Sequence, residues 1–326
     1  MSGHEGPFFD ELNVGDVFDT APALTLTAGR AAVHQSILGS RLRLSLDASF
    51  AQRVTGLESA DPSFVWDVAI GQSTLVTRRV VANLFYRGLA FHRLPSIGDT
   101  LYTRTEVVGL RQNASRPSGL AALRITTRDQ EDRLVLDFWR CAMLPLSSPD
   151  VQTGREDDLS SIGTAPDPAS ISTMVRGWNC SGIPASGGIA RGDKWVLEAG
   201  DLVSGAAELA RLTLNVAHIH HDRFSQSSGR LVYGGHTIGL ALAQLTRTLP
   251  NLITIASWHS CDHTGPVREG DTLVSSIEVL DVEELCGGED QLTGLKAVTL
   301  RVLASAKRDA NPSEPVLDWK LTALSK

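Results

Sequence analysis

The residue types best suited to chemistry gather in one stretch of the second half of the chain, residues 212–245. Its first part is a polar run made up of Asn215, His218, His220, His221 and Asp222. Histidine can take up and release a proton near neutral pH because its ordinary pKa is about 6.5. The run therefore favours general acid–base catalysis, with a metal site or a solvated polar loop as the alternatives.

The second part of this stretch begins with Tyr233, Gly234, Gly235 and His236 and continues as an apolar run to Leu245. This pattern predicts a buried helix with a glycine-rich start. The start of a helix exposes backbone N–H groups at the positive end of its dipole, and glycine lets a ligand approach them closely. Such a site suits the binding of an oxyanion. The alternatives are that the glycines form only a tight turn and that His236 only caps the helix or packs in the core.

Composition bounds the class of protein. The chain has 326 residues, 42% of them hydrophobic, which is enough for two domains with full cores. Its formal net charge is −7 and its basic residues are scattered, which argues against a nucleic-acid-binding surface. No apolar run reaches the roughly 20 residues of a membrane span, and the amino terminus lacks a secretory pattern. We therefore expect a cytoplasmic protein that binds neither nucleic acid nor membrane.

The four cysteines are Cys141, Cys180, Cys261 and Cys286. They are far apart and lack CxxC spacing, which argues against a disulfide framework or a zinc site. Buried free thiols are the preferred interpretation.

In the first half, a helix is predicted over residues 28–38, with Thr27 as its N-cap and Gly39 as its stop signal. A second, buried helix is predicted over residues 64–75. Beyond it the apolar residues alternate with a period of two, which predicts strands. These strands are expected over residues 80–85, 101–108, 121–127 and 134–143, and the first domain is expected to end near Pro145.

The chain contains an internal repeat. The sequence GDTL at residues 98–101 recurs at 270–273, and VLD at 135–137 recurs at 316–318. Matching the halves on these motifs pairs Ser40 with Asn215, Ser45 with His220 and Asp47 with Asp222. The candidate active site therefore exists in one copy only, because serine cannot act as a base near neutral pH.

The repeat predicts an α+β architecture of two similar units. Each unit is expected to contain a long central helix wrapped by a curved antiparallel sheet, and a ligand groove is expected between the units. The amino-terminal unit is predicted over residues 1–146 and the catalytic unit over residues 173–326. Residues 147–172, rich in Ser, Asp, Pro and Gly, are predicted to form a surface linker.

The ordered set of motifs resembles the MaoC-type double-hotdog hydratases over nearly the whole chain. In the first half the matching stretches are residues 38–41, 47–51, 81–84, 98–101 and 135–137, and in the second half they are 215–217 with His220, 230–236 and 270–272. The resemblance implies a tandem double hotdog and a hydro-lyase that acts on an acyl-CoA. It also implies no metal, no cofactor besides the CoA of the substrate, and a homodimer.

In the family, an aspartate and a histidine lie five residues apart in the pattern Asp-x-Asn-Pro-x-His. Here His220 matches the histidine, while Asn215 replaces the aspartate. The resemblance implies that His220 and Asn215 are the catalytic pair, although Asn215 can only orient water. The residues implied in substrate binding are Tyr233, Gly234, Gly235, His236 and His263.

The asparagine also bears on the substrate. Two carboxylates ~4 Å apart at an effective dielectric near 20 repel each other by ~4 kcal/mol, and Asn215 avoids this repulsion if the substrate is itself an anion. This favours a dicarboxylic acyl-CoA such as mesaconyl-CoA. The resemblance implies that the reaction is the reversible dehydration of β-methylmalyl-CoA to mesaconyl-CoA and water.

Three other functions remain open: a general MaoC-type enoyl-CoA hydratase, a hotdog thioesterase and a non-catalytic acyl-CoA binder. A binder needs no histidine beside the thioester. A thioesterase needs a carboxylate or a water-positioning group near Gly239, and residues 237–244 offer none. Candidate ligands for CoA phosphates or a substrate carboxylate are Arg87, Arg93, Arg191 and Arg268, with solvated surface as the alternative for each.

Overall fold

The two halves of the chain fold into the same succession of elements. The computed structural model describes residues 5–163, 165–181, 183, 188–224, 230–285, 294–308 and 313–326. The first half contains η1 (Phe9–Glu11), β1 (Val17–Phe18), β2 (Leu24–Thr25), α1 (Ala28–Leu38), α2 (Arg43–Leu46), α3 (Ala48–Thr55), α4 (Pro62–Gln72), η2 (Ser73–Leu75), β3 (Ala82–Phe91), β4 (Thr100–Gln112), β5 (Ser118–Arg128) and β6 (Leu134–Pro145). The second half contains α5 (Pro168–Met174), β7 (Lys194–Val196), β8 (Asp201–Leu202), α6 (Ala206–Leu212), η3 (His218–His220), α7 (Gly234–Thr248), β9 (Leu252–His263), β10 (Thr272–Glu284), β11 (Lys296–Lys307) and β12 (Glu314–Ser325).

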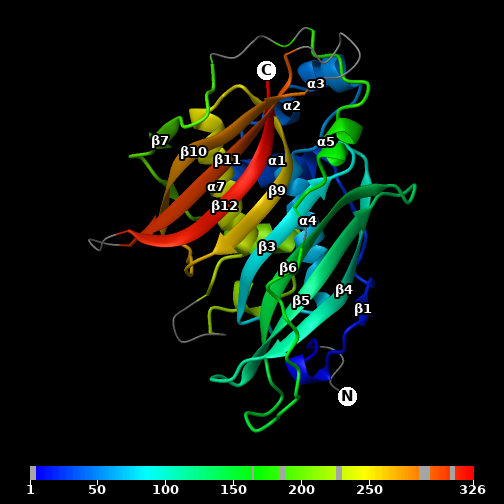
Figure 1. The fold of residues 1–326 in the computed structure, drawn as a ribbon, viewed down its shortest axis with the longest axis vertical. Coiled ribbons are helices and arrows are strands. Elements are labelled where there is room, and N and C mark those ends of the chain that lie inside the picture. Colours follow the sequence, from blue (N-terminus) through cyan, green and yellow to red (C-terminus); the bar gives the residue numbers. More distant parts are fainter. Residues whose placement is uncertain are drawn as a thin grey trace.

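One antiparallel sheet runs through both halves in the order β1-β4-β5-β6-β3-β9-β12-β11-β10-β7. The order is the same from either end when corresponding strands are matched, and β3 pairs with β9 at the centre. Figure 1 shows the long strands of the two halves side by side, with α4 and α7 behind them. The predicted tandem double hotdog, with a long helix wrapped by antiparallel strands in each half, is confirmed.

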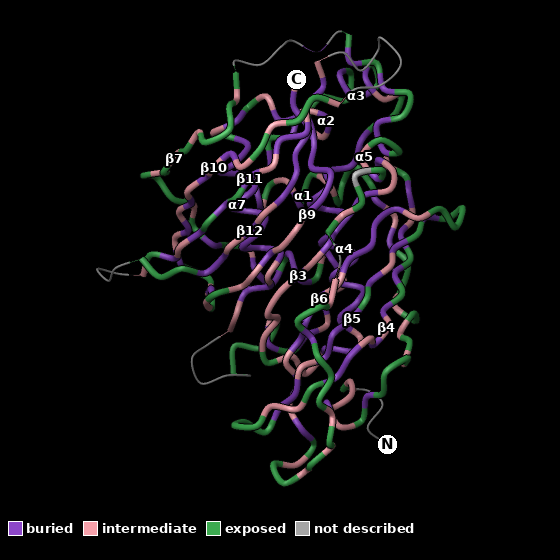
Figure 2. Tube along the Cα trace, in the orientation of Figure 1, coloured by how far each residue is buried: buried purple, intermediate pink, exposed green. Residues whose placement is uncertain are grey.

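The predicted helices of the first half are present. Thr27 accepts a hydrogen bond from the backbone N–H of Arg30 at the start of α1, and Gly39 ends the helix with a φ of 78°. Asp61 caps α4, and Pro62 occupies its first turn, where a missing N–H costs nothing. All eleven residues of α4 are buried, as are most of those of α7 (Figure 2).

The strands are longer than predicted. β3 continues to Phe91, although the predicted strand ends at residue 85. The register between β3 and β6 shifts between Arg87 and Ala90, where Gly88 has a φ of 60°. Such a bulge interrupts the alternation of side chains, so a period of two cannot follow the strand through it.

Residues after β6 cover the outer face of the first half of the sheet. Leu159 packs with Cys141, and Glu156 forms a β-bridge with Arg111. Helix α5 spans Pro168–Met174, so the predicted boundary between residues 172 and 173 falls inside a helix.

Both halves share one hydrophobic core. Trp66 of α4 packs against Trp258 of β9 and Trp319 of β12, with ring centroids 4.7 and 6.1 Å apart. Because a helix of the first half is buried against strands of the second, neither half has a core of its own.

Cys141, Cys180 and Cys261 are buried free thiols, as predicted, whereas Cys286 lies outside the described residues. Among the described helices, none combines the length and apolar character needed to cross a membrane.

Two pairs of matched hydrogen bonds fix the correspondence between the halves. Gln72 of α4 donates to the carbonyl of Leu101 at 3.0 Å, and Gln244 of α7 donates to that of Leu273 at 2.8 Å. The hydroxyl of Thr74 accepts from the backbone N–H of Val216 at 2.9 Å, and that of Thr246 accepts from Arg41 at 3.0 Å. Since Arg41 matches Val216, the preceding residues Ser40 and Asn215 correspond, as the repeat predicts.

Candidate active site

A cavity of about 280 Å³ lies between the two halves. The first half contributes the carboxyl end of α4, the segment after it, and residues of β3 and β6. The second half contributes the η3 region, the start of α7 and the end of β9. A hollow enclosed by both repeats is where the sequence places a ligand site.

Five of the seven predicted site residues line this cavity: Asn215, His220, Tyr233, Gly234 and His263. Gly235 and His236 do not line it. The structure thus brings together residues that lie up to about fifty positions apart in the sequence. Because neither Gly235 nor His236 lines the cavity, their substrate-binding roles stay predictions.

His220 has the tautomer of a general base. Its Nδ1 lies 3.1 Å from the carbonyl oxygen of Leu231. Because a carbonyl only accepts, Nδ1 carries the proton and Nε2 keeps its lone pair. Burial lowers the pKa of His220 to about 4, so the ring is neutral at pH 7. The Tyr233 ring lies edge-on to it at 5.9 Å and helps to hold its orientation.

Asn215 is buried and presents a hydrogen-bond donor. Its Oδ1 accepts from the backbone N–H of Ala217 at 3.0 Å, so the amide orientation is set by the chain itself. Its Nδ2 is buried and has no hydrogen-bond partner. A buried unpaired donor costs about 1–3 kcal/mol, which a ligand oxygen at this position would recover.

The start of α7 is open toward the cavity. The helix begins at Gly234, within the predicted glycine-rich start, and has no side-chain cap. The backbone N–H of His236 donates to the carbonyl of Tyr233 at 2.9 Å, which leaves those of Gly234 and Gly235 as the donors without intrahelical acceptors. A Cβ on Gly234 would stand 2.7 Å from Nε2 of His263, so a larger residue here would have to displace the His263 ring.

The matching start of α4 is closed. Asp61 accepts hydrogen bonds from the backbone N–H of Ser63 at 2.8 Å, from the Ser63 hydroxyl, and from the Ser40 hydroxyl at 2.8 Å. Pro62 has no N–H to offer. The first half therefore uses the position equivalent to Asn215 to hold its own helix cap, so this polar group is already paired within the chain.

Among the other polar residues that line the cavity are Arg140 and Asn83, neither of which was predicted from the sequence. Nε of Arg140 and both amide atoms of Asn83 are buried without hydrogen-bond partners, as is Nε2 of His263. Arg140 could have been found, because it alternates with Phe138 and Ala142 on the inward face of β6, where a charged residue is unusual.

His236 is completely buried, and neither ring nitrogen has a hydrogen-bond partner. At the spacing of the matched glutamines it corresponds to Phe64 of α4. Burial lowers its pKa to about 4, as it does for His220 and His263.

These histidines predict an acid-sensitive fold. Each has a folded-state pKa below its unfolded value of about 6.5, so the unfolded chain binds more protons between pH 6.5 and 4. The free energy of unfolding should therefore be intact above pH 6.5 and fall as the pH drops through this window. His236→Phe should reduce that loss by up to about 1.4 kcal/mol per pH unit, measured by denaturant unfolding at pH 7, 6 and 5. An unchanged pH dependence would mean that His236 is not a buried neutral residue, and the turnover of the same variant tests its predicted binding role.

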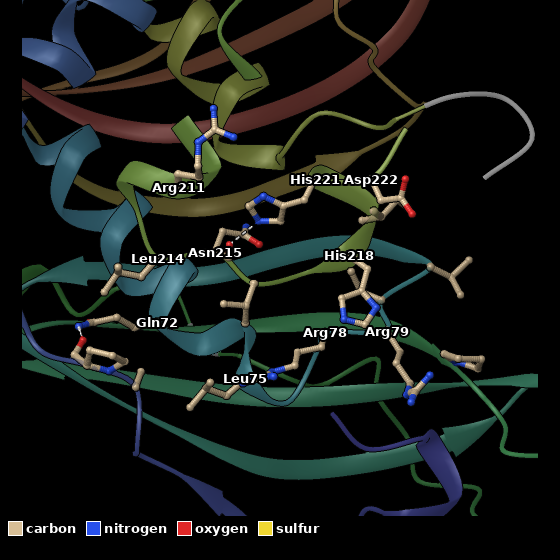
Figure 3. A pocket seen from close by; sticks show the side chains of 17 residues that line it. Gln72, Leu75, Arg78, Arg79, Arg211, Leu214, Asn215, His218, His221 and Asp222 are labelled. Carbon is tan, nitrogen blue, oxygen red and sulfur yellow. Dashed lines mark hydrogen bonds between the residues drawn. The ribbon is translucent and has the colours of Figure 1, made fainter. Parts of the chain in front are cut away.

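A wider groove of about 1040 Å³ adjoins the cavity and shares Val80, Val81, Asn215 and Ile219 with it. Figure 3 shows its side chains, which include Arg78, Arg79, Arg211, His218 and His221. His221 bonds to the carbonyl of Asn215 at 2.6 Å and so supports the loop that holds this residue.

The four arginines proposed from the sequence line neither hollow. Arg87 pairs with Asp262 at 2.7 Å and Arg93 with Asp99 at 2.8 Å, so these two stabilise the fold. As for the metal alternative, no group of three His, Cys, Asp or Glu side chains suited to a metal ion occurs within the described ranges.

Comparison with known proteins supports the assignment of the fold. The solved structure of RV0216 of Mycobacterium tuberculosis, described as having a double hotdog fold, is 53% identical, covers 99% of both chains and superposes with a TM-score of 0.89. That of a putative MaoC domain protein dehydratase from Chloroflexus aurantiacus is 27% identical, covers 100% of this chain and 99% of that one, and has a TM-score of 0.86. The curated β-methylmalyl-CoA dehydratase of Chloroflexus aurantiacus is 29% identical over 93% of this chain and 89% of its own length. No family model matches the chain.

The duplicated helix-in-sheet units, with a cavity between them, define a double-hotdog protein. At 53% identity over its whole length to a solved double hotdog, the chain belongs to the double-hotdog proteins, and a MaoC domain protein is among its full-length relatives. The family predicted from its motifs is confirmed, and the predicted hydro-lyase class agrees with the names of these relatives.

Proposed function

We propose that this chain is an acyl-CoA hydro-lyase that interconverts β-methylmalyl-CoA with mesaconyl-CoA and water. The main support is the cavity itself, where the lone pair of His220, the open start of α7 and the unpaired Nδ2 of Asn215 meet. The name of the Chloroflexus aurantiacus dehydratase supports the same chemistry.

In the hydration direction, the thioester oxygen lies against the N–H group of Gly234, which lines the cavity at the start of α7. Nε2 of His220 removes a proton from water while the water oxygen bonds to the β-carbon, and the π electrons move to the thioester oxygen as an enolate. Each backbone donor to that oxygen contributes about 3 kcal/mol. The protonated His220 then delivers its proton to the α-carbon, so the ring returns to its neutral state and one water has been added.

Asn215 has a positioning role in this scheme. Its Nδ2 donates a hydrogen bond to the attacking water, while its Oδ1 stays bound to Ala217. Because an amide cannot act as a base, one residue, His220, serves both proton transfers.

The CoA moiety is proposed to occupy the adjoining groove. The shared residues Val80 and Val81 make the groove continuous with the cavity, and Arg79 and Arg211 provide positive charge along it. Arg79 pairs with Glu5 and Arg211 with Glu208 at the surface. Exposed ion pairs of this kind are weak enough for a phosphate group to take the place of the carboxylate.

We further propose that the reaction needs no separate cofactor, and that the protein is a cytoplasmic homodimer. Turnover unaffected by a metal chelator, and a mass of twice 35.0 kDa by light scattering, are the expected results. Loss of turnover on chelation would contradict the first of these proposals.

The thioesterase alternative has one feature in its favour, because the structure does place a carboxylate near α7. Asp67 of α4, the counterpart of Gly239, lies 2.1 Å from where a Cβ on Gly235 would stand. However, Asp67 is completely buried and does not line the cavity. It bonds to His34 at 2.9 Å and accepts from Tyr233 at 3.2 Å, and burial raises its pKa. Asp67 therefore has a structural role, and hydration is favoured over thioester hydrolysis.

Deuterium incorporation tests the proposed chemistry. When mesaconyl-CoA is hydrated in ²H₂O, one carbon-bound deuterium is expected on the α-carbon of the product, detected by mass spectrometry after transfer to ordinary water. Unchanged mesaconyl-CoA, or hydrolysis to the free acid without deuterium on carbon, would contradict a hydratase.

Asn215→Asp tests the assignment of a dicarboxylic substrate. A second carboxylate ~4 Å from that of the substrate should cost up to ~4 kcal/mol, so kcat/KM for mesaconyl-CoA should fall by about 10²-fold or more. The neutral crotonyl-CoA should lose much less. Equal losses on both substrates would show that Asn215 is needed for its donor, and a wild-type preference for crotonyl-CoA would leave only a general enoyl-CoA hydratase.

A further inference from the structure

Arg140 is a buried cation at the wall of the active-site cavity. It lies on β6, is 3% exposed, and lines the same hollow as His220 and Asn215. Its Nη2 donates to the hydroxyl of Thr77 at 2.5 Å and to the carbonyl of Ser73 at 3.4 Å, near the carboxyl end of α4. These neutral oxygens orient the guanidinium but do not neutralise it.

No carboxylate of the described residues forms an ion pair with Arg140, and its Nε is buried without a hydrogen-bond partner. Arginine stays protonated at neutral pH even when buried. A buried charge normally has a counter-ion, because removing it from water unpaired is costly. The hydroxyls of Tyr86 and Tyr233, which act on Arg140 electrostatically, remain neutral because burial raises their pKa and so do not supply a counter-ion.

The internal repeat shows that this polarity is not required by the fold. Arg140 pairs with Tyr86 across β6 and β3, and at the matching place Leu321 pairs with Trp258 across β12 and β9. Leu321 and Trp258 are completely buried apolar residues. The same strand position thus holds a leucine that lines neither of the two hollows described above, and an arginine that lines the cavity.

We propose that Arg140 binds a free carboxylate on the acyl group of the substrate and so selects dicarboxylic over neutral acyl-CoA esters. This inference rests on the proposed function for the location of the thioester. A guanidinium offers two parallel N–H donors to a carboxylate, and the unpaired Nε is one member of such a pair. Asn83, whose amide lies unpaired in the same wall, is placed to bind the same group. The cavity of about 280 Å³ is just below the 300 Å³ or so at which drug-sized ligand sites begin, which suits a short acyl chain.

Binding of two unreactive acyl-CoA esters tests this assignment without turnover. Succinyl-CoA and butyryl-CoA have equal chain lengths and differ in a terminal carboxylate against a methyl group. The wild-type protein is expected to bind succinyl-CoA about 30-fold or more tightly than butyryl-CoA by calorimetry. Arg140→Leu, which copies Leu321, should bring this ratio to about one or reverse it. Arg140→Lys should leave an intermediate ratio, because it keeps the charge but not the paired donors.

Arg124→Leu is the matched control, since Arg124 lies on the neighbouring strand β5, is 45% exposed and pairs with Asp137 outside the cavity. It should keep the wild-type ratio. A wild-type ratio near one would overturn the inference even if Arg140→Leu failed to fold, and so would a folded Arg140→Leu protein that still preferred succinyl-CoA. A clear preference for succinyl-CoA without hydration of mesaconyl-CoA would instead contradict the proposed function and leave the role of Arg140 standing.

Discussion

Replacing His220 by alanine is expected to lower kcat for the hydration of mesaconyl-CoA by about 10³-fold or more. In His220 the contact of Nδ1 with the carbonyl of Leu231 fixes the proton on Nδ1, so the ring, which is neutral at pH 7, presents the lone pair of Nε2. A single general acid–base residue contributes about 10²- to 10⁴-fold, and here it serves two proton transfers. Stopped assays of hydrated product would measure the effect.

Ser45→Ala supplies the control from the other repeat. Ser45 corresponds to His220, and its hydroxyl is buried without a hydrogen-bond partner. Its removal should therefore leave both kcat and stability close to the wild-type values. If His220→Ala kept more than about a tenth of the wild-type kcat, or if Ser45→Ala lost as much, the assignment of the active half would be wrong.

Gly71→Ala is expected to have the largest effect on the fold and to act on the site as well. A Cβ at Gly71 would stand 1.8 Å from the carbonyl oxygen of Thr213 and 3.2 Å from the backbone nitrogen of Asn215. Backbone atoms cannot rotate away, so α4 and the Asn215 loop must separate. Overpacking of this kind costs about 3 kcal/mol or more, and it displaces Asn215. Both the free energy of unfolding and kcat should fall.

Ala243 occupies the matched position of α7, where a Cβ on the facing Gly39 would still be 3.9 Å away from it. Ala243→Gly should therefore cost only about 1 kcal/mol, the helix penalty of glycine. Denaturant unfolding of both variants makes the comparison. A Gly71→Ala protein as stable and as active as the wild type would show that the close approach of α4 to Thr213 is not needed.

Much of the fold could be predicted because its information is local or repeated. The caps at Thr27 and Gly39, the apolar run of α7 and the two GDTL motifs each identify an element without reference to distant residues. The short strands β1 and β7, which are equivalent in the two halves, were not predicted, since two or three residues are too few to show a period.

The site could be predicted in part for the same reason. Asn215 and His220 lie close together in the sequence, and the glycines at 234 and 235 indicate the start of a helix. Arg140 belongs to the other half, and its place beside His220 depends on the pairing of β6 with β3 and on the packing of α4, which no local pattern reveals. The alternation on β6 could thus have identified Arg140 as an inward-facing charge, but its place in the cavity depends on long-range pairing.

The central claim, reversible hydration of a dicarboxylic acyl-CoA at His220, is tested most directly by following mesaconyl-CoA with two signals at once, the enoyl absorbance and free thiol. The proposed function predicts that the wild-type protein removes the enoyl absorbance down to an equilibrium level without releasing thiol, and that His220→Ala does not. Release of thiol, or no change in either signal with the wild-type protein, would contradict it.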